Sequence, residues 1–231
     1  MDLVFAGRFQ GPLGSANGGY ACGRLAALVD ADVVEVTLRL PPPLERPLEV
    51  RCADDSVRLL DGDALVGEGR PAELELVVPA PVSVTEAEEA STRHIPAVAR
   101  DFAECFSCGV RSEGDGLRIY AGAVRGREPV HAAPWKVGET SAELVWAAID
   151  CSGAYAVGAT GRGEVVLGRM TARVLCAPES GTTGLVVAWP LGEEGRKLYA
   201  GTALFADDGE LLAFARQTWI EPRSPTPISE G

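Results

Sequence analysis

The sequence contains one pattern twice, first as Asn17-Gly18-Gly19-Tyr20-Ala21 and again, 135 residues later, as Ser152-Gly153-Ala154-Tyr155-Ala156. Each copy opens a stretch with helical character, and in the first half this stretch runs to about Val29. Self-similarity at a fixed offset is the signature of a repeated structural unit. The chain is therefore expected to fold as two similar halves, each built around one central helix.

Strands follow the helix in the same order in both halves. Alternating apolar residues predict the strands, and Asp-Gly turns precede the last strand of each half. A helix with a few antiparallel strands predicts an α+β arrangement, in which the helix packs on one face of the sheet. The predicted strands lie at residues 33–40, 48–50 and 64–76 in the first half and at 165–175, 185–187, 196–205 and 211–220 in the second.

The composition fits a folded chain of two units. Of the 231 residues, 46% are hydrophobic and 23% are charged, close to the average of globular proteins. We expect an N-terminal unit at 1–80 and a linker at 81–101, where acidic residues gather. A C-terminal unit at 102–222 and a Pro/Ser-rich tail at 223–231 would complete the chain.

The charge of the chain excludes several kinds of partner. Its formal net charge is −12, and no cluster of Lys or Arg interrupts the acidic background. This argues against a surface that follows nucleic-acid phosphates and against a basic membrane face. No apolar run reaches the ~18 residues of a membrane span. The first residues lack a secretory signal pattern, so a cytoplasmic location is expected.

The spacing of the cysteines gives little support for a metal site. Of the six cysteines, only Cys105 and Cys108 form a close pair, whereas a structural zinc site normally needs two such pairs. A redox pair would be expected between a strand and a helix, but a polar loop follows Cys108. We expect structural thiols here, and at Cys151 either a small buried residue or a reactive thiol. No metal and no cofactor are predicted.

Three stretches of the sequence resemble the hotdog fold in its double-hotdog form, as found in acyl-CoA thioesterases of the thioesterase II type. They are residues 105–109 followed by 116–119, residues 145–153, and residues 208–219. The resemblance covers most of the second half and matches the first half more loosely. It implies a double hotdog, an acyl-CoA substrate and a homodimer.

Asp150 is the candidate general base, because the resemblance implies that an Asp in the second central helix orients the attacking water. Its neighbours Trp146 and Ile149 are apolar, and desolvation raises the pKa of a carboxyl group. An Asp before Cys-Ser-Gly could equally begin a helix as its cap. By the same resemblance, Gln217 would hold the water or polarise the thioester carbonyl. The alternative for Gln217 is an exposed position on an edge strand.

The third partner in the family is a Thr on the strand after the helix, and here the matching position falls at Gly168. Thr171 could take that role only if the strand register shifts by an odd number of residues, which also turns its side chain to the other face. The phosphates of CoA need a local basic patch. Arg169 is one candidate for it among several basic residues of the second half, and a solvated strand face is the alternative.

Asn17, Gly18 and Gly19 resemble the start of the hotdog helix in the phenylacetyl-CoA thioesterase type, where a Gly N–H forms the oxyanion hole. Unpaired N–H groups at a helix N-terminus suit that task. In that type an acid lies about two turns further on, but residues 24–27 contain none. The alternative is Asn17 as a plain N-cap, with two glycines that let the helix approach the sheet.

The sequence therefore predicts an acyl-CoA thioesterase-like hydrolase. An acyl-CoA or acyl-chain binding protein of the same fold, without turnover, is the alternative, and the missing Thr and the acid-free first half favour it. A hydratase is excluded, since neither His94 nor His131 follows an Asp at the required spacing. No Gly-x-Ser-x-Gly motif indicates a Ser-His-Asp hydrolase.

Overall fold

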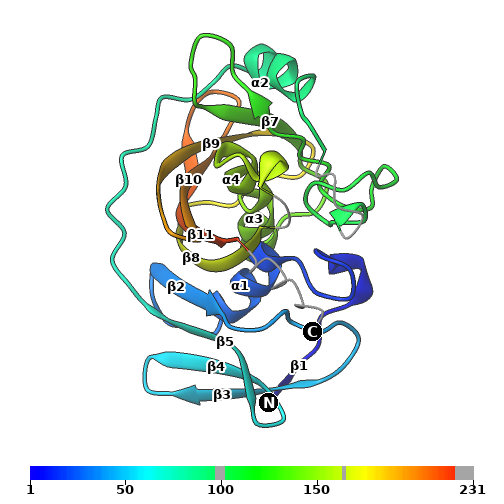
Figure 1. Cartoon of the computed structure of the whole chain (residues 1–231), viewed down its shortest axis with the longest axis vertical. Coiled ribbons are helices and arrows are strands. Elements are labelled where there is room, and N and C mark those ends of the chain that lie inside the picture. Colours follow the sequence, from blue (N-terminus) through cyan, green and yellow to red (C-terminus); the bar gives the residue numbers. More distant parts are fainter. Residues whose placement is uncertain (97–101, 163–164, 222–231) are drawn as a thin grey trace, which may run out of the picture.

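A long antiparallel sheet dominates the computed structural model, which describes residues 1–96, 102–162 and 165–221. In these ranges the sheet has eleven strands in the order β1-β3-β4-β5-β2-β8-β11-β10-β9-β7-β6 (Figure 1). The predicted tail at 223–231 lies outside the described residues. The strands are β1 (Asp2–Leu3), β2 (Val33–Leu38), β3 (Leu48–Ala53), β4 (Ser56–Asp61), β5 (Ala64–Pro71), β6 (Gly122–Ala123), β7 (His131–Lys136), β8 (Val166–Val174), β9 (Thr183–Glu194), β10 (Lys197–Phe205) and β11 (Leu211–Ile220).

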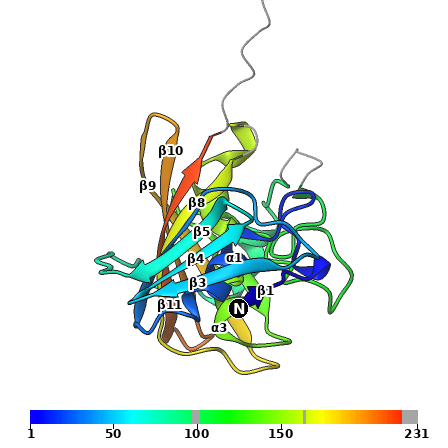
Figure 2. The same cartoon turned by 90° about the horizontal axis from the view of Figure 1, so that it is seen from below.

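The strand order repeats, as the duplicated sequence pattern predicts. The first half runs β1-β3-β4-β5-β2. The second half, read from the other end of the sheet, begins with the additional short strand β6 and then runs β7-β9-β10-β11-β8. In both runs the strand that follows the central helix lies innermost. These two strands, β2 and β8, pair antiparallel with Val36 opposite Met170, and so join the halves into one sheet (Figure 2).

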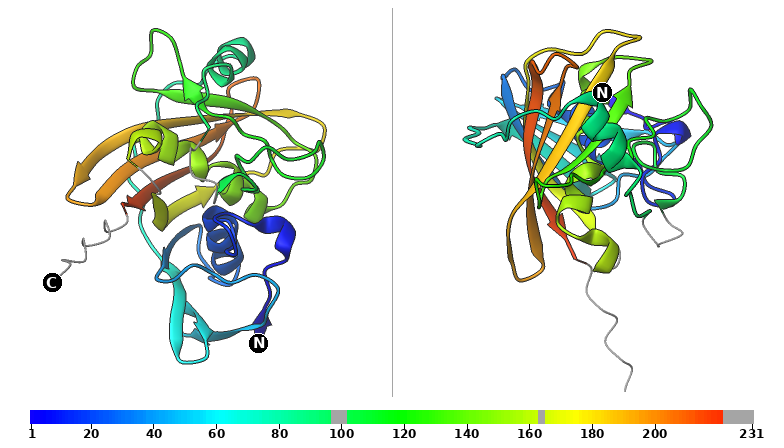
Figure 3. Two further views of the ribbon diagram at one scale, coloured as in Figure 1. Left: turned by 45° about the vertical axis from the view of Figure 1, so that its right-hand side comes forward. Right: turned by 90° about the horizontal axis from the view of Figure 1, so that it is seen from above.

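Three helices lie inside the curve of this sheet (Figures 1 and 3). They are α1 (Gly18–Ala26) from the first half and α3 (Ala142–Ala148) and α4 (Cys151–Ala156) from the second. Their apolar faces and the inner face of the sheet form one continuous core. The side chain of Asn17 caps α1 by accepting from the Tyr20 N–H, and Ser141 caps α3 by accepting from the Leu144 N–H. Polar residues at these two points therefore define where the helices begin.

The second half departs from the predicted single helix. The chain leaves helical geometry at Asp150, whose ψ is −82°, so α3 and α4 are separate helices with a break between them. Because of this break, carbonyl groups at the end of α3 lose their helical N–H donors and must find partners elsewhere.

A further helix, α2 (Val84–Ser91), lies within the predicted linker. The acidic residues that favoured a linker belong to this helix, and Glu86 in its first turn forms a capping box with Ser83. The apolar side chains of Ala87 and Ala90 pack into a second, smaller core with strands β7 and β9. Strand β5 also ends at Pro71, five residues before the predicted end at Leu76.

None of the helices in the described part of the chain combines the length and the apolarity that a bilayer-spanning segment requires.

Helices α1 and α3 approach each other through glycine. A Cβ atom at Gly23 would lie 2.7 Å from the Cα atom of Glu143, and one at Gly19 would lie 2.5 Å from the carbonyl oxygen of Trp146. Both obstacles are backbone atoms, which cannot turn away as a side chain can. The missing side chains on α1 therefore set the distance between the two helices.

We expect Gly23→Ala to destabilise the fold by about 2 kcal/mol. Overpacking a core costs ~1–3 kcal/mol, and a backbone clash belongs at the upper end, whereas the better helix propensity of Ala returns only ~1 kcal/mol. Urea unfolding measures the difference. Gly138→Ala is the control, because a Cβ there meets nothing within 4 Å. Equal midpoints for both variants would show that the helices do not depend on this contact.

Candidate active site

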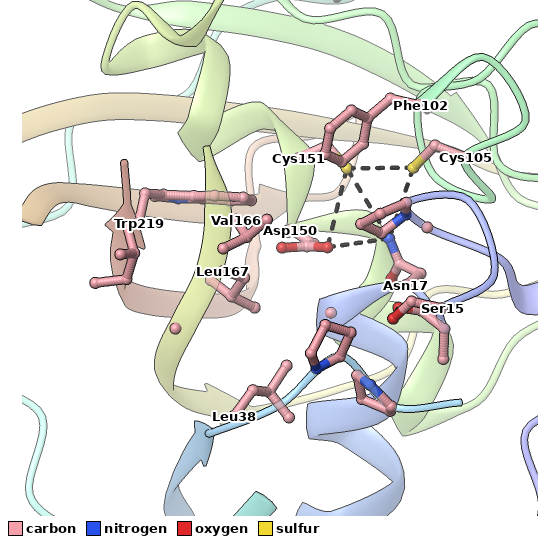
Figure 4. Close-up of a pocket in the computed structure, with 18 of the residues that line it drawn as sticks. Ser15, Asn17, Leu38, Phe102, Cys105, Asp150, Cys151, Val166, Leu167 and Trp219 are labelled. Atoms are coloured by element: carbon pink, nitrogen blue, oxygen red, sulfur yellow. Dashed lines mark hydrogen bonds between the residues drawn. The ribbon is translucent and has the colours of Figure 1, made fainter. Parts of the chain in front are cut away.

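Asp150 lies at the break between α3 and α4, and its side chain is buried, with 2% of the residue exposed. Its Oδ2 accepts hydrogen bonds from Asn17 Nδ2 at 3.0 Å, from the Gly19 N–H at 2.9 Å and, at 3.9 Å, from the Cys151 thiol (Figure 4). Its Oδ1 is buried and has no hydrogen-bond partner among the described residues. Burial raises the pKa of Asp150 to about 7, and the bond from the Gly19 N–H opposes that rise.

Asn17 and Gly19 bring the first half of the chain to this carboxylate. Asn17 is the N-cap of α1 through its Oδ1, as the structural alternative predicted, while its Nδ2 donates to Asp150. The Gly19 N–H belongs to the first turn of α1, where backbone donors have no partner within the helix. The start of α1 has no acid of its own nearby, and it contacts Asp150, the acid of the second half.

Asp150 itself occupies the N-cap position of α4 but makes no capping bond there. The sequence left a catalytic acid and a helix cap as alternatives. Its carboxylate turns instead toward α1, and the start of α4 gains nothing from it. Asp150 therefore has the position of a helix cap, but its side chain accepts hydrogen bonds from the first half of the chain instead.

An apolar cavity of about 240 Å³ adjoins Asp150 and Gly18. Residues of both halves line it, and strand β8 contributes one wall and the segment before α1 another (Figure 4). Asp150 is the one carboxylate among the lining residues, so its carboxyl group faces an otherwise apolar space. The apolar lining consists of Pro12, Ala16, Leu38, Leu40, Pro41, Pro42, Phe102, Val166, Leu167, Trp219 and Ile220.

Gln217 holds the helix break in place. Its side chain is wholly buried, and Nε2 donates to the carbonyl oxygens of Ile149 at 2.7 Å and Asp150 at 3.1 Å. Its Oε1 accepts from Trp219 Nε1 at 2.9 Å. The predicted exposed position on an edge strand is therefore wrong, since β11 lies between β8 and β10. Both N–H groups of the Gln217 amide are engaged with backbone carbonyls, and Gln217 does not line the cavity.

The structure does not bring Thr171 and Arg169 to Asp150. Thr171 Oγ1 donates to Glu35 Oε2 at 3.4 Å, and Arg169 Nε donates to Thr37 Oγ1 at 2.9 Å. Both side chains lie on the outer face of the sheet, whereas Met170 between them is buried in the core. The catalytic role expected for Thr171 is therefore corrected, because its side chain does not reach Asp150, whereas a contact of Arg169 with the CoA phosphates stays a prediction.

The physical reason is a β-bulge. In the pairing of β8 with β11, Arg169 is opposite Thr218 and Leu167 is opposite Trp219, so Gly168 is the extra residue. The register of β8 therefore shifts by one residue at Gly168, before the chain reaches Thr171. After the bulge, alternation turns Met170 inward and Thr171 outward.

The sequence argument missed one grouping at the site. Cys151, the residue after Asp150, lies beside the Cys105-x-x-Cys108 pair, and the Sγ atoms of Cys105 and Cys151 are 3.6 Å apart. Cys105 and Cys151 both line the cavity. A hydrogen bond from the Cys108 thiol, another from Cys151 and backbone N–H groups hold the pKa of Cys105 well below its usual value. The only sign of this grouping in the sequence is that Cys151 directly follows Asp150, the candidate acid.

Comparison with known proteins identifies the fold. No protein-family model matches the sequence, and no curated protein matches it either. Among solved structures, a proposed thioesterase II from Thermobifida fusca is similar, with a TM-score of 0.62, 15% identity and coverage of 96% of this chain and 92% of that one. A proposed thioesterase from Novosphingobium aromaticivorans gives a TM-score of 0.61 at 14% identity, covering 96% and 95% of the two chains.

A tesB protein from Mycobacterium avium subspecies paratuberculosis is also similar, with a TM-score of 0.59, 12% identity and coverage of 90% and 88%. A protein of Alicyclobacillus acidocaldarius described as having a hotdog fold has a TM-score of 0.56 at 13% identity and covers 92% and 89%. At these identities the likeness concerns the fold. The chain has a hotdog fold, and its resemblance to thioesterase II-like proteins is confirmed at that level.

We expect Gln217→Met to destabilise the protein by about 2 kcal/mol or more. Met has a similar volume but leaves the Ile149 carbonyl and the Trp219 indole N–H buried without partners, and each such group costs ~1–3 kcal/mol. Thermal unfolding followed by circular dichroism measures the loss. Thr218→Val, on the other face of the same strand, is the control and should change stability by less than ~0.5 kcal/mol. If the two variants unfold at the same midpoint temperature, Gln217 does not support the break between α3 and α4.

Proposed function

We propose that the chain is a double hotdog that hydrolyses an acyl thioester, with an acyl-CoA as the substrate. Two observations support the double form, namely the repeated strand order and one set of central helices in each half. The two solved structures above that are described as thioesterases share the fold over most of both chains. The homodimer and the cytoplasmic location remain predictions.

One observation carries this proposal, the buried carboxylate of Asp150 at the wall of an apolar cavity. One of its oxygens is held by Asn17 and Gly19, which fixes the orientation of the group. The other oxygen has no partner in the described part of the chain. A carboxylate in this setting can accept a proton from a water molecule in the cavity, which is the task of a general base.

The reaction then has a role for each neighbouring group. Asp150 takes a proton from water, the water oxygen attacks the thioester carbonyl carbon, and the C–S bond breaks. The proton on Asp150 passes to the departing CoA sulfur, which restores the carboxylate. The Gly18 N–H, the first of α1, has no acceptor within its own helix and borders the cavity, so it is the donor we assign to the oxyanion.

The cavity favours a short, apolar acyl group. Its lining is dominated by Leu, Val, Pro, Ile and Trp side chains. Its volume of about 240 Å³ is below the ~300–1,000 Å³ of pockets that enclose drug-sized ligands. Arg39, the cation at its wall, forms an ion pair with Glu68.

A binding protein without turnover is the second candidate, and two observations favour it. The Gln217 amide donates to backbone carbonyls rather than to the cavity, and Thr171 lies on the other face of the sheet. If the protein were an enzyme, Asp150 would act as the base without Gln217 and Thr171, the two partners that the family resemblance implied.

We expect the wild-type protein to release free CoA from a short-chain acyl-CoA, and Asp150→Asn to lower the rate by ~10²-fold or more, as is typical for loss of a general base. Asn keeps the shape of the side chain but cannot accept the proton. The assay compares short, medium, long and aromatic acyl-CoAs with a thiol reagent that detects CoA. Asp63→Asn, an exposed acid in a hairpin turn, is the control and should keep full activity.

The results separate the two candidates. Hydrolysis that survives in Asp150→Asn would contradict the role of Asp150 as the base. A wild-type protein that binds an acyl-CoA by calorimetry but releases no CoA from any member of the panel would favour the binding protein.

A further inference from the structure

Three cysteine thiols meet beside Asp150. The Sγ atoms of Cys105, Cys108 and Cys151 are buried and all lie within 4.8 Å of one another. The first two come from the loop that precedes β6, and the third is the first residue of α4. The sequence argument counted only the close pair, because Cys151 joins it from a segment 46 residues away from Cys105. We call this group the thiol cluster.

We infer that the thiol cluster binds a zinc ion. Zn–S bonds are ~2.3 Å long, and a tetrahedral arrangement then places two sulfurs ~3.8 Å apart. The Cys105 and Cys151 sulfurs are 3.6 Å apart, which fits two ligands of one ion. A disulfide would join two sulfurs at ~2.05 Å and leave the third without a role, whereas an ion uses all three.

Hydrogen-bond donors around the sulfurs fit thiolate ligands. The Asn17 Nδ2 lies 3.8 Å from Cys105 Sγ and 3.9 Å from Cys151 Sγ, so one side-chain donor faces two of the three sulfurs. The loop is closed by the Gly109 N–H, which donates to the Cys105 carbonyl at 2.7 Å. Binding the ion releases the thiol protons to solvent, and the N–H donors stabilise the negative charge on sulfur.

The number and type of ligands favour zinc over hard cations and over iron–sulfur clusters. Mg²⁺ and Ca²⁺ take oxygen ligands, and iron–sulfur clusters generally need four cysteines. Three protein ligands leave one position of a tetrahedral zinc site open. Cys105 and Cys151 both line the cavity, so a water molecule from the cavity is the fourth ligand that we assign.

The first experiment measures metal in the full-length protein, purified with a phosphine reductant and without chelator. We expect one zinc per chain by plasma mass spectrometry in the wild type and in Cys52→Ser, whose thiol is exposed and outside the cluster. Cys108→Ser should bind zinc at least ~10²-fold more weakly, because even loss of a residue that only supports a ligand costs ~10- to 100-fold in affinity. Cys108 does not line the cavity, so this variant leaves its wall intact.

A second measurement does not depend on whether the variant folds. Zinc in the wild-type protein is replaced by Co²⁺, and the intensity of the thiolate-to-cobalt charge-transfer band gives the number of sulfur ligands, which we expect to be three. Wild-type protein that takes up no stoichiometric zinc or cobalt under reducing conditions would overturn the inference. An intact mass two hydrogens lower, located by peptide mapping to a disulfide within the thiol cluster, would overturn it as well. Neither readout involves hydrolysis, so this test is independent of the proposed function.

Discussion

The carboxylate of Asp150 is held by the Asn17 side chain and the Gly19 N–H, and these two bonds connect the central helices of both halves. A buried carboxylate is costly unless it is hydrogen-bonded. Three features of the local structure allow the hydrogen bonds to Asp150 to form. Glycine on α1 lets the backbones approach, the break after α3 turns the carboxylate toward α1, and Gln217 takes up the carbonyls that the break exposes.

The site is asymmetric although the halves share one strand order. The first half supplies N–H donors at a helix start, and the second half supplies the acid. At the offset of 135 residues, the counterpart of Asp150 is Ser15, so the repeat yields one such site at α1 rather than two equivalent ones. The apolar walls also come from both sides of the β2–β8 junction, for example from Leu38 and Leu167. The hydrogen bonds and the cavity at Asp150 therefore depend on residues of both halves.

Features that depend on local pattern could be predicted from the sequence, whereas those that depend on register and distant contacts could not. The repeated helix and its strands follow from alternation and turns, whereas the meeting of Asn17 and Gly19 with Asp150 is a contact between the two halves that no local pattern indicates. Thr171 and Arg169 face away because of one extra residue, Gly168, and no propensity reveals a bulge. The approach of Cys151 to Cys105 depends on how a loop folds over α4, which spacing alone does not disclose.

The two ends of the sheet bear on how this protein can associate. Its outermost strands, β1 and β6, have two residues each, and beside β6 the strand β7 contains Pro134, which has no N–H to offer. Long unpaired edges are where sheets of separate molecules add to one another, and short or proline-bearing edges discourage it. Partner molecules are thus steered away from strand addition at the β6–β7 end of the sheet. Assembly at that end would use the faces of the sheet or the helices, where side chains rather than backbone decide which surfaces fit.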